Sequence, residues 1–213
     1  MKSPTFAYIA TFTYLIPPLA GIWRFKQLDR PMKMFFLLCV WSLIEVTAEY
    51  ILSVKHINNS FLINYYFLID SLFLSVVYSY SIEDKRTKRI ILILAMLFIV
   101  IWVIDELTFA VPGQLNNEMA VTSRIFIIVA SILIVLAVMK KTDSLLIDRP
   151  IFWVSMGYVL YSAGVLLIFG LSNELLKIGM FYFHIAWHIN WSLAIVANLM
   201  FTRSFYCRAK QQI

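Results

Sequence analysis

Histidines and carboxylates lie inside stretches of this sequence that are otherwise apolar. His184 and His188 are one helical turn apart in the run FHIAWH, which places both imidazoles on one face of a helix. Two imidazoles at that spacing can bind the same metal ion. The sequence therefore predicts a metal site that uses His184, His188 and a carboxylate from another segment, for which Glu49 is the candidate.

Carboxylates at membrane depth are the second chemical feature. Glu45 and Glu49 share one face of an apolar helix, and Asp70 lies in the middle of the next one. A carboxylate that faced lipid there would cost about 2.5–3.5 kcal/mol, so these groups must face inward and be protonated, paired or hydrated. Arg124 alone cannot neutralise three carboxylates. We therefore predict an acidic cavity that suits a proton, a metal ion or a cationic ligand, with the ligand-binding residues Glu45, Glu49, Asp70, Arg124, Trp187 and His188.

A purely structural interpretation of the same residues stays open. In it, Glu45 is neutral and hydrogen-bonded between helices, Arg124 pairs with Asp105 or Glu106, and the histidines bond to backbone carbonyls and tyrosine hydroxyls. Hydrogen bonds between membrane helices contribute on average about 0.6 kcal/mol each, yet they fix the register of neighbouring helices. On this interpretation, substitutions would lower stability without removing a binding site.

The elements that must hold these residues are membrane-spanning helices. Hydrophobic residues make up 62% of the 213 and charged residues 14%, with a mean hydropathy of +0.82, against about 45–50% and about 25% in soluble domains. A helix needs about 20 apolar residues to cross a bilayer. Seven windows reach that length, so we predict an all-α, single-domain, seven-helix membrane bundle with spans at about 5–23, 34–54, 61–80, 90–109, 120–139, 151–171 and 178–202.

The basic residues orient this bundle. Cytoplasmic loops of membrane proteins are enriched in Lys and Arg, and most of the 18 basic residues fall on one side of the membrane if the N-terminus lies outside. We therefore predict a multi-pass protein of the cell membrane with a cytoplasmic C-terminus. The net charge of +6 then reflects contact with the headgroups of the lipid bilayer, and nucleic acid is not an expected partner.

Short echoes in the sequence suggest an internal repeat. Arg30-Pro31 opens the second span as Arg149-Pro150 opens the sixth, and Tyr65-Tyr66-Phe67 in the third span resembles Phe181-Tyr182-Phe183 in the seventh. These echoes align the first three spans with the last three and leave the fourth as a linker. Such a three-plus-one-plus-three plan places a site between the halves, and we expect an outward-facing cavity between the second, third, fifth and seventh spans.

The last span resembles the closing motif of a known superfamily. The motif His184-x-x-Trp187-His188, together with Asp70 in the third span, is similar to the ceramidase and adiponectin-receptor superfamily of seven-helix zinc hydrolases. The resemblance implies zinc as cofactor and a metal-dependent intramembrane hydrolase as function. That superfamily also uses a Ser-x-x-x-His pair in its second span, where this chain has Ser42, Glu45 and Glu49 and no histidine.

A second resemblance covers more of the chain. Tyr65-Tyr66-Phe67, the later Tyr78 and Tyr80, Phe152-Trp153, and Trp187-His188 leading to Asn198 look like small bacterial seven-helix proteins, which occur alone or as input modules beside signalling enzymes. This resemblance implies a sensory or receptor-like role and a cytoplasmic signalling partner.

Two other classes of seven-helix protein can be weighed against the sequence. A retinal protein needs a lysine in its last span for the Schiff base, and residues 178–202 contain none. A small-solute transporter of the three-plus-one-plus-three plan is expected to carry a proline in the first helix of each unit; Pro17-Pro18 meets this, but residues 119–139 contain no proline. We predict a non-enzymatic sensor or receptor-like module, with the metal-dependent hydrolase and then the transporter as alternatives.

Overall fold

The computed structural model describes residues 5–109, 116–141 and 145–207, and these residues are almost entirely helical. Seven of its helical segments are long and apolar enough to cross a membrane. This confirms the prediction of an all-α bundle with seven apolar spans. The helices are α1 (Thr5–Thr13), α2 (Ile16–Arg24), α3 (Arg30–Val54), α4 (Ser60–Ser81), α5 (Lys85–Thr108), α6 (Asn117–Lys141), α7 (Pro150–Ile178) and α8 (Met180–Tyr206), with short 3₁₀ turns at Phe25–Gln27 and Leu146–Asp148.

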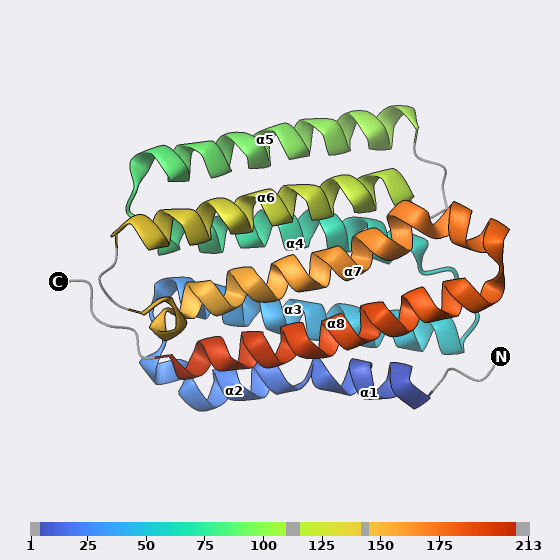
Figure 1. Ribbon diagram of the computed structural model, residues 1–213, viewed down its shortest axis with the longest axis horizontal. Helices are drawn as coiled ribbons and strands as arrows, with labels where there is room; N and C mark the ends of the chain where they lie inside the picture. The colour runs from blue at the N-terminus through green and yellow to red at the C-terminus, as the bar shows by residue number, and fades with distance from the viewer. Residues whose placement is uncertain (1–4, 110–115, 142–144, 208–213) are drawn as a thin grey trace.

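The helices run roughly side by side; α2 continues in the direction of α1, and each later connection between spans places the next span antiparallel to the last (Figure 1). The first span, α1 with α2, packs against α8 and α3; α3 packs on α4, α4 on α6, α6 on α7, and α7 on α8, which closes a ring. The fourth span, α5, packs mainly on α4 and α6 and lies outside that ring. We call the end where α1 begins the N-terminal end of the bundle, and the end where α8 finishes the C-terminal end.

Local signals in the sequence explain where several helices begin. Asp29 caps α3 by accepting a hydrogen bond from the backbone N–H of Met32 at 3.0 Å, and Asp84 caps α5 in the same way through Arg86 and Thr87. Pro150 occupies the first turn of α7, where a missing N–H costs no helical hydrogen bond. These starts lie at the C-terminal end, beside the basic residues that follow them.

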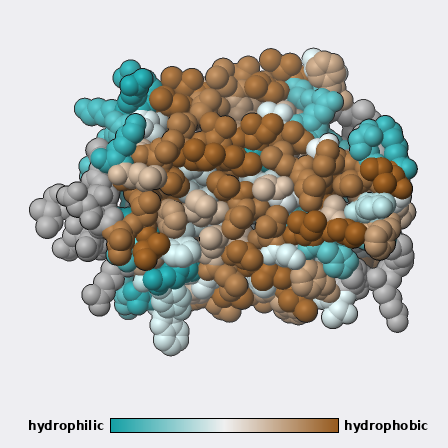
Figure 2. Space-filling view, in the orientation of Figure 1, coloured by the Kyte–Doolittle hydropathy of each residue, from teal (hydrophilic) through white to brown (hydrophobic). Residues whose placement is uncertain are grey.

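The surface is apolar over the middle of the bundle and polar at its two ends. Figure 2 shows a broad hydrophobic band on the face in view, with hydrophilic residues gathered at both ends of the helices. Large side chains in the middle of α5, such as Met96 and Leu97, are more than half exposed on this surface. Aqueous exposure on that scale would be costly, so the natural environment of the band is a lipid bilayer.

The first span is interrupted rather than continuous. The predicted span 5–23 is a single helix in the sequence interpretation, but α1 ends at Thr13 and α2 starts at Ile16. The cause is Pro17-Pro18, because neither proline has a backbone N–H to donate to the carbonyl four residues earlier. The break is tied to α8, since Nδ2 of Asn198 donates to Oγ1 of Thr13 at 2.9 Å.

Other boundaries also differ from the predicted spans. The sixth was predicted at 151–171, yet α7 continues to Ile178, and the fourth begins at Lys85 rather than near residue 90. Hydropathy identifies only the apolar part of a helix, whereas the helix itself continues through polar residues at its ends. The internal repeat stays a prediction.

Packing is denser toward the C-terminal end. The larger cluster of buried residues is centred on rings from α3, α7 and α8, with Phe35 close to Tyr158, Phe201 and Phe205 at centroid distances of 6.5, 5.4 and 5.5 Å. At the N-terminal end the buried cluster is small, consisting of Tyr66, Phe67, Ala120 and Val165. The larger cluster of buried aromatic side chains therefore lies toward the C-terminal end of the bundle.

The turn between α7 and α8 consists of one glycine, and we expect Gly179→Ala to lower the free energy of unfolding by about 1–2 kcal/mol. Gly179 has φ +143° and ψ +153°, a conformation that is open essentially only to glycine. The measurement is the free energy of unfolding in detergent. Gly170→Ala in α7 is the matched control, since a Cβ there meets only ordinary contact with Val121 at 3.8 Å; an equal loss in both variants would contradict the prediction.

Candidate functional site

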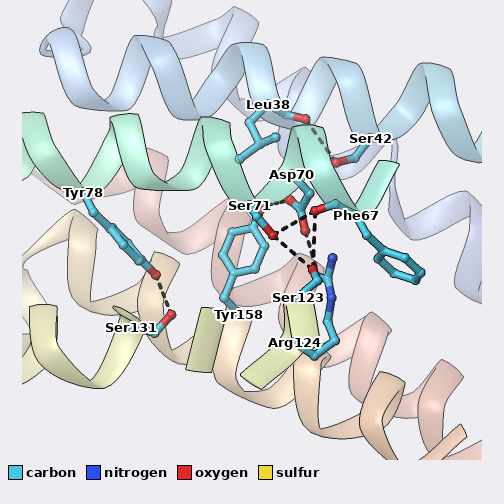
Figure 3. Close-up of polar contacts among 10 residues, drawn as sticks. All are labelled: Leu38, Ser42, Phe67, Asp70, Ser71, Tyr78, Ser123, Arg124, Ser131 and Tyr158. Carbon is cyan, nitrogen blue, oxygen red and sulfur yellow. Dashed lines mark hydrogen bonds and ion pairs between the residues drawn. The ribbon is translucent and has the colours of Figure 1, made fainter. Parts of the chain in front are cut away.

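A buried ion pair joins α4 to α6 near the middle of the bundle. Nη1 of Arg124 donates to Oδ2 of Asp70 at 2.8 Å, and neither side chain is exposed. From α7, the hydroxyl of Tyr158 donates to Oδ1 of Asp70, also at 2.8 Å. The three side chains converge between their helices (Figure 3). Arg124 therefore compensates the charge of Asp70, and the pair adds no net charge to the interior.

Hydroxyl pairs extend this contact between α4 and α6. The Oγ atoms of Ser71 and Ser123 are 3.0 Å apart next to the ion pair, and the hydroxyls of Tyr78 and Ser131 are 2.6 Å apart closer to the C-terminal end (Figure 3). Hydrogen bonds between helices fix their register. This seam thus holds Arg124 opposite Asp70.

The remaining donors of Arg124 are not used by the described residues. Its Nε and Nη2 have no hydrogen-bond partner there. The guanidinium instead lies near three rings, with Cζ 4.9 Å from the ring centroid of Phe67, 5.7 Å from that of Tyr161 and 5.9 Å from that of Tyr66. Rings at this range attract a cation through their negative faces. The same three residues also line the cavity described next.

A cavity of about 220 Å³ lies between α1, α3, α4, α7 and α8 in the half of the bundle toward its N-terminal end. Most of its wall is aromatic or apolar. Its polar lining comes from Thr11, Tyr14, Glu45, Glu49 and Asn190, and from the hydroxyls of Tyr66 and Tyr161. None of the described lining residues is basic. An apolar pocket with a few converging polar groups is the common form of a small-molecule site.

Glu45 and Glu49 are the acidic groups of this cavity. They lie one turn apart on α3, and both line the cavity. Glu45 is only 6% exposed, and its Oε1 has no hydrogen-bond partner among the described residues. Both side chains therefore point toward the interior of the bundle, as predicted.

The cavity differs from the predicted one in the helices that form it. The sequence placed it between the second, third, fifth and seventh spans, but the first and sixth spans also line it, and no described residue of the fifth span does. Asp70 and Arg124, which were predicted to bind ligand, pair with each other behind the ring wall. Asp105, the alternative partner of Arg124, instead accepts a hydrogen bond from Nδ2 of Asn116.

The histidines of α8 are placed differently from the prediction. Neither His184 nor His188 lines the cavity, whereas Trp187 does. His188 is exposed, its ring stacks on Phe6 at a centroid distance of 5.8 Å, and its Nδ1 lies 2.7 Å from the carbonyl oxygen of His184. Trp187, Asn190 and Trp191 lie on the face of α8 that lines the cavity. Residues 184 and 188 lie on the neighbouring face of the same helix.

A metal centre built on these histidines is not assembled in the structure. Across residues 5–109, 116–141 and 145–207, no three His, Cys, Asp or Glu side chains come together in a group that could hold a metal ion. Glu49, the carboxylate predicted to complete the site, lines the cavity with Glu45, whereas the two histidines do not line it. Zinc binding and hydrolysis stay predictions from the resemblance of the last span.

A second, much smaller cavity lies beneath the first. Its volume is about 20 Å³, enough for a water molecule. It shares Tyr14, Tyr66, Tyr161 and Ala194 with the larger cavity and also reaches Asn198. Together the tyrosines form a partition between the cavity and the densely packed part of the bundle.

Several residues of the site were not predicted from the sequence. Tyr14, Tyr161 and Asn190 line the cavity, and Tyr158 binds Asp70. One available signal was the spacing of Tyr158, Tyr161 and Val165, which places them on one face of α7. For Tyr14 the signal was its position just before Pro17-Pro18, where a broken helix brings a side chain to the interior.

Comparison of the chain with models of protein families, with curated proteins and with solved structures found no match.

Proposed function

We propose that this protein is a receptor-like or sensory membrane module that binds a small ligand in the cavity between α1, α3, α4, α7 and α8. The observation that carries the proposal is the buried Oε1 of Glu45, which faces no hydrogen-bond partner among the described residues although Glu45 lines a cavity of about 220 Å³. A buried polar atom without a partner costs about 1–3 kcal/mol. A ligand that supplies the missing partner recovers that cost.

The first span offers a route from the cavity to the other end of the bundle. Ala10, Thr11 and Tyr14 line the cavity just before the break at Thr13–Ile16, and α2 continues from there to the C-terminal end in contact with α8 and α3. A ligand shifts a conformational equilibrium only by binding one state better. A ligand that contacts α1 better at one angle between α1 and α2 than at another would favour that angle. The change of angle would then move α2 toward a cytoplasmic partner.

The proposal includes an orientation, with the cavity open toward the outside and the C-terminal end in the cytoplasm. Basic residues described at the C-terminal end include Arg24, Arg30, Lys85 and Lys88, and such residues stay on the cytoplasmic side. We expect a reporter that is active only in the cytoplasm to be active when it is fused after residue 213. Activity of a periplasmic or extracellular reporter at that position would contradict the orientation.

The binding function can be tested by blocking the cavity. Ala10 is 3% exposed and lines the cavity, so Ala10→Leu fills part of it. Thermal melts of the purified protein are measured with Zn²⁺, Na⁺, amino acids, sugars, amines and fatty acids. A compound present at about 100 times its dissociation constant stabilises the wild type by about 2.7 kcal/mol, and we expect Ala10→Leu to lose this effect.

Ala95→Leu is the matched control for this test. Ala95 is 6% exposed but lies in α5, away from the cavity. Overpacking lowers the stability of either variant by about 1–3 kcal/mol, yet only Ala10→Leu should abolish the ligand-dependent rise of Tm. A wild type that no compound stabilises, or a rise that survives Ala10→Leu, would refute binding at this site.

A small-solute transporter is the second candidate, and the break in the first span favours it. Interrupted helices beside a substrate site are a recurring feature of transporters, and here the break adjoins both cavities through Tyr14. Uptake into proteoliposomes separates the two functions. A compound that stabilises the protein should accumulate in the vesicles if the protein is a transporter, and should bind without entering them if it is a receptor.

A further inference from the structure

The charges around the cavity restrict the chemistry of its ligand. Its described ionisable lining residues, tyrosines aside, are Glu45 and Glu49. The nearest buried cation, Arg124, is held by Asp70 at 2.8 Å and lies behind the rings of Tyr66, Phe67 and Tyr161. An anionic ligand would thus meet two carboxyl groups and no described basic side chain, whereas a cation would meet groups that attract it.

Glu45 does not accept a hydrogen bond from Arg124, the buried cation behind the ring wall. Arg124 keeps two N–H groups, at Nε and Nη2, without a partner, and Glu45 keeps Oε1 without one. A direct contact between them would satisfy both side chains, but the described structure contains no such contact. Oε1 of Glu45 is thus left without a partner, and Glu45 itself lines the cavity.

The unused polar atom of the cavity lining is an acceptor. It is Oε1 of Glu45, which is buried and has no partner among the described residues; the unpartnered Oδ1 of Asn190 lies against Gly164 of α7, outside the cavity lining. Acceptors are satisfied only by a ligand that donates hydrogen bonds. An ammonium group has up to three donors and a positive charge, whereas a quaternary ammonium has the charge but no donor.

The walls suit the rest of such a ligand. Trp187 and Trp191 of α8, Phe169 of α7 and Tyr66 of α4 line the cavity. Aromatic faces attract cations and also accept an apolar skeleton. Two carboxyl groups with no third His, Cys, Asp or Glu beside them among the described residues are, in contrast, a poor site for a metal ion.

We propose that the ligand of this cavity is a primary ammonium ion on a compact apolar skeleton, held by Glu45 and Glu49 and enclosed by the aromatic walls. This inference rests on the proposed binding function and names the class of ligand. The ammonium donates to Oε1 of Glu45 and to the carboxylate of Glu49. The skeleton then lies between the rings of α7 and α8.

The test uses four probes that share a phenylethyl skeleton and differ in the head group: 2-phenylethylammonium, its N-trimethyl derivative, 2-phenylethanol and 3-phenylpropionate. Affinities are measured by calorimetry on the full-length protein in nanodiscs. We expect the primary ammonium to bind best. Glu45→Gln should weaken its binding about tenfold or more, the scale of one hydrogen bond to a charged group, and Glu49→Gln should act in the same direction.

Glu118→Gln is the matched control, because Glu118 is an exposed carboxylate at the same end of the bundle that does not line the cavity. Its affinity for the primary ammonium should equal that of the wild type. The inference is overturned if 2-phenylethanol or 3-phenylpropionate binds as well as the ammonium, if Glu45→Gln lowers stability without changing affinity, or if no probe binds. Binding of a neutral or anionic compound that Ala10→Leu abolishes would leave the proposed function standing.

Discussion

Asp70→Asn is expected to lower the free energy of unfolding by about 3–5 kcal/mol, the largest effect we predict for a single substitution. The reason is the charge left behind. Arg124 is fully buried, its Nη1 is bound to Asp70 at 2.8 Å, and its other donors have no partner among the described residues. Asparagine keeps the shape of the side chain but removes the charge that compensates the guanidinium.

A double-mutant cycle measures the interaction energy between Asp70 and Arg124 apart from the effect of each single substitution. Arg124→Gln leaves the buried carboxylate of Asp70 with Tyr158 as its remaining partner among the described residues, so this variant is also strongly destabilised. The double variant contains neither charge. We expect the double variant to be more stable than the sum of the single losses predicts. Asp148→Asn, at an exposed position, is the control for the loss of a carboxylate. Additive losses in the cycle would show that the two charges do not depend on each other.

Phe35→Ala is expected to lower the free energy of unfolding by about 3 kcal/mol. Phe35 is 1% exposed and lies among Tyr158, Phe201 and Phe205 in the densely packed part of the bundle. Lipid is as apolar as this core, so the loss comes from the unfilled space and the missing contacts rather than from exposure to water.

Phe12→Ala is the matched control for this prediction. Phe12 is 68% exposed on α1 and faces the surroundings of the bundle. Its removal leaves no cavity, so the free energy of unfolding, measured by denaturation in mixed micelles, should change by less than about 0.5 kcal/mol. Similar losses in both variants would mean that Phe35 contributes apolar surface and no specific packing.

These predictions concern the part of the fold that positions the site. The ion pair holds α4, α6 and α7 together, and two of the rings that screen Arg124, those of Tyr66 and Tyr161, come from α4 and α7 and also line the cavity. The dense aromatic cluster around Phe35 fills the bundle toward the C-terminal end. The ion pair and the aromatic cluster therefore hold the helices together at places outside the cavity.

The amino-acid sequence by itself determined the helices and the burial of the carboxylates. The length of the apolar windows, the basic residues at one end and the cost of a charge in lipid were sufficient to predict seven spans and to place Glu45, Glu49 and Asp70 inside the bundle. Each of these conclusions depends on one segment and on its solvent, so no knowledge of neighbouring helices was needed.

Only the tertiary structure decided which polar groups meet. Asp70 is paired with Arg124 and Tyr158, Glu45 and Glu49 line the cavity together, and Nδ1 of His188 meets the backbone carbonyl of His184. These contacts depend on how each helix is rotated about its axis. In a soluble protein the apolar face sets that rotation, but a helix between lipid and an apolar core is hydrophobic on both faces. The rotation is then set by packing and hydrogen bonds between helices, and the pattern of a single span does not contain them.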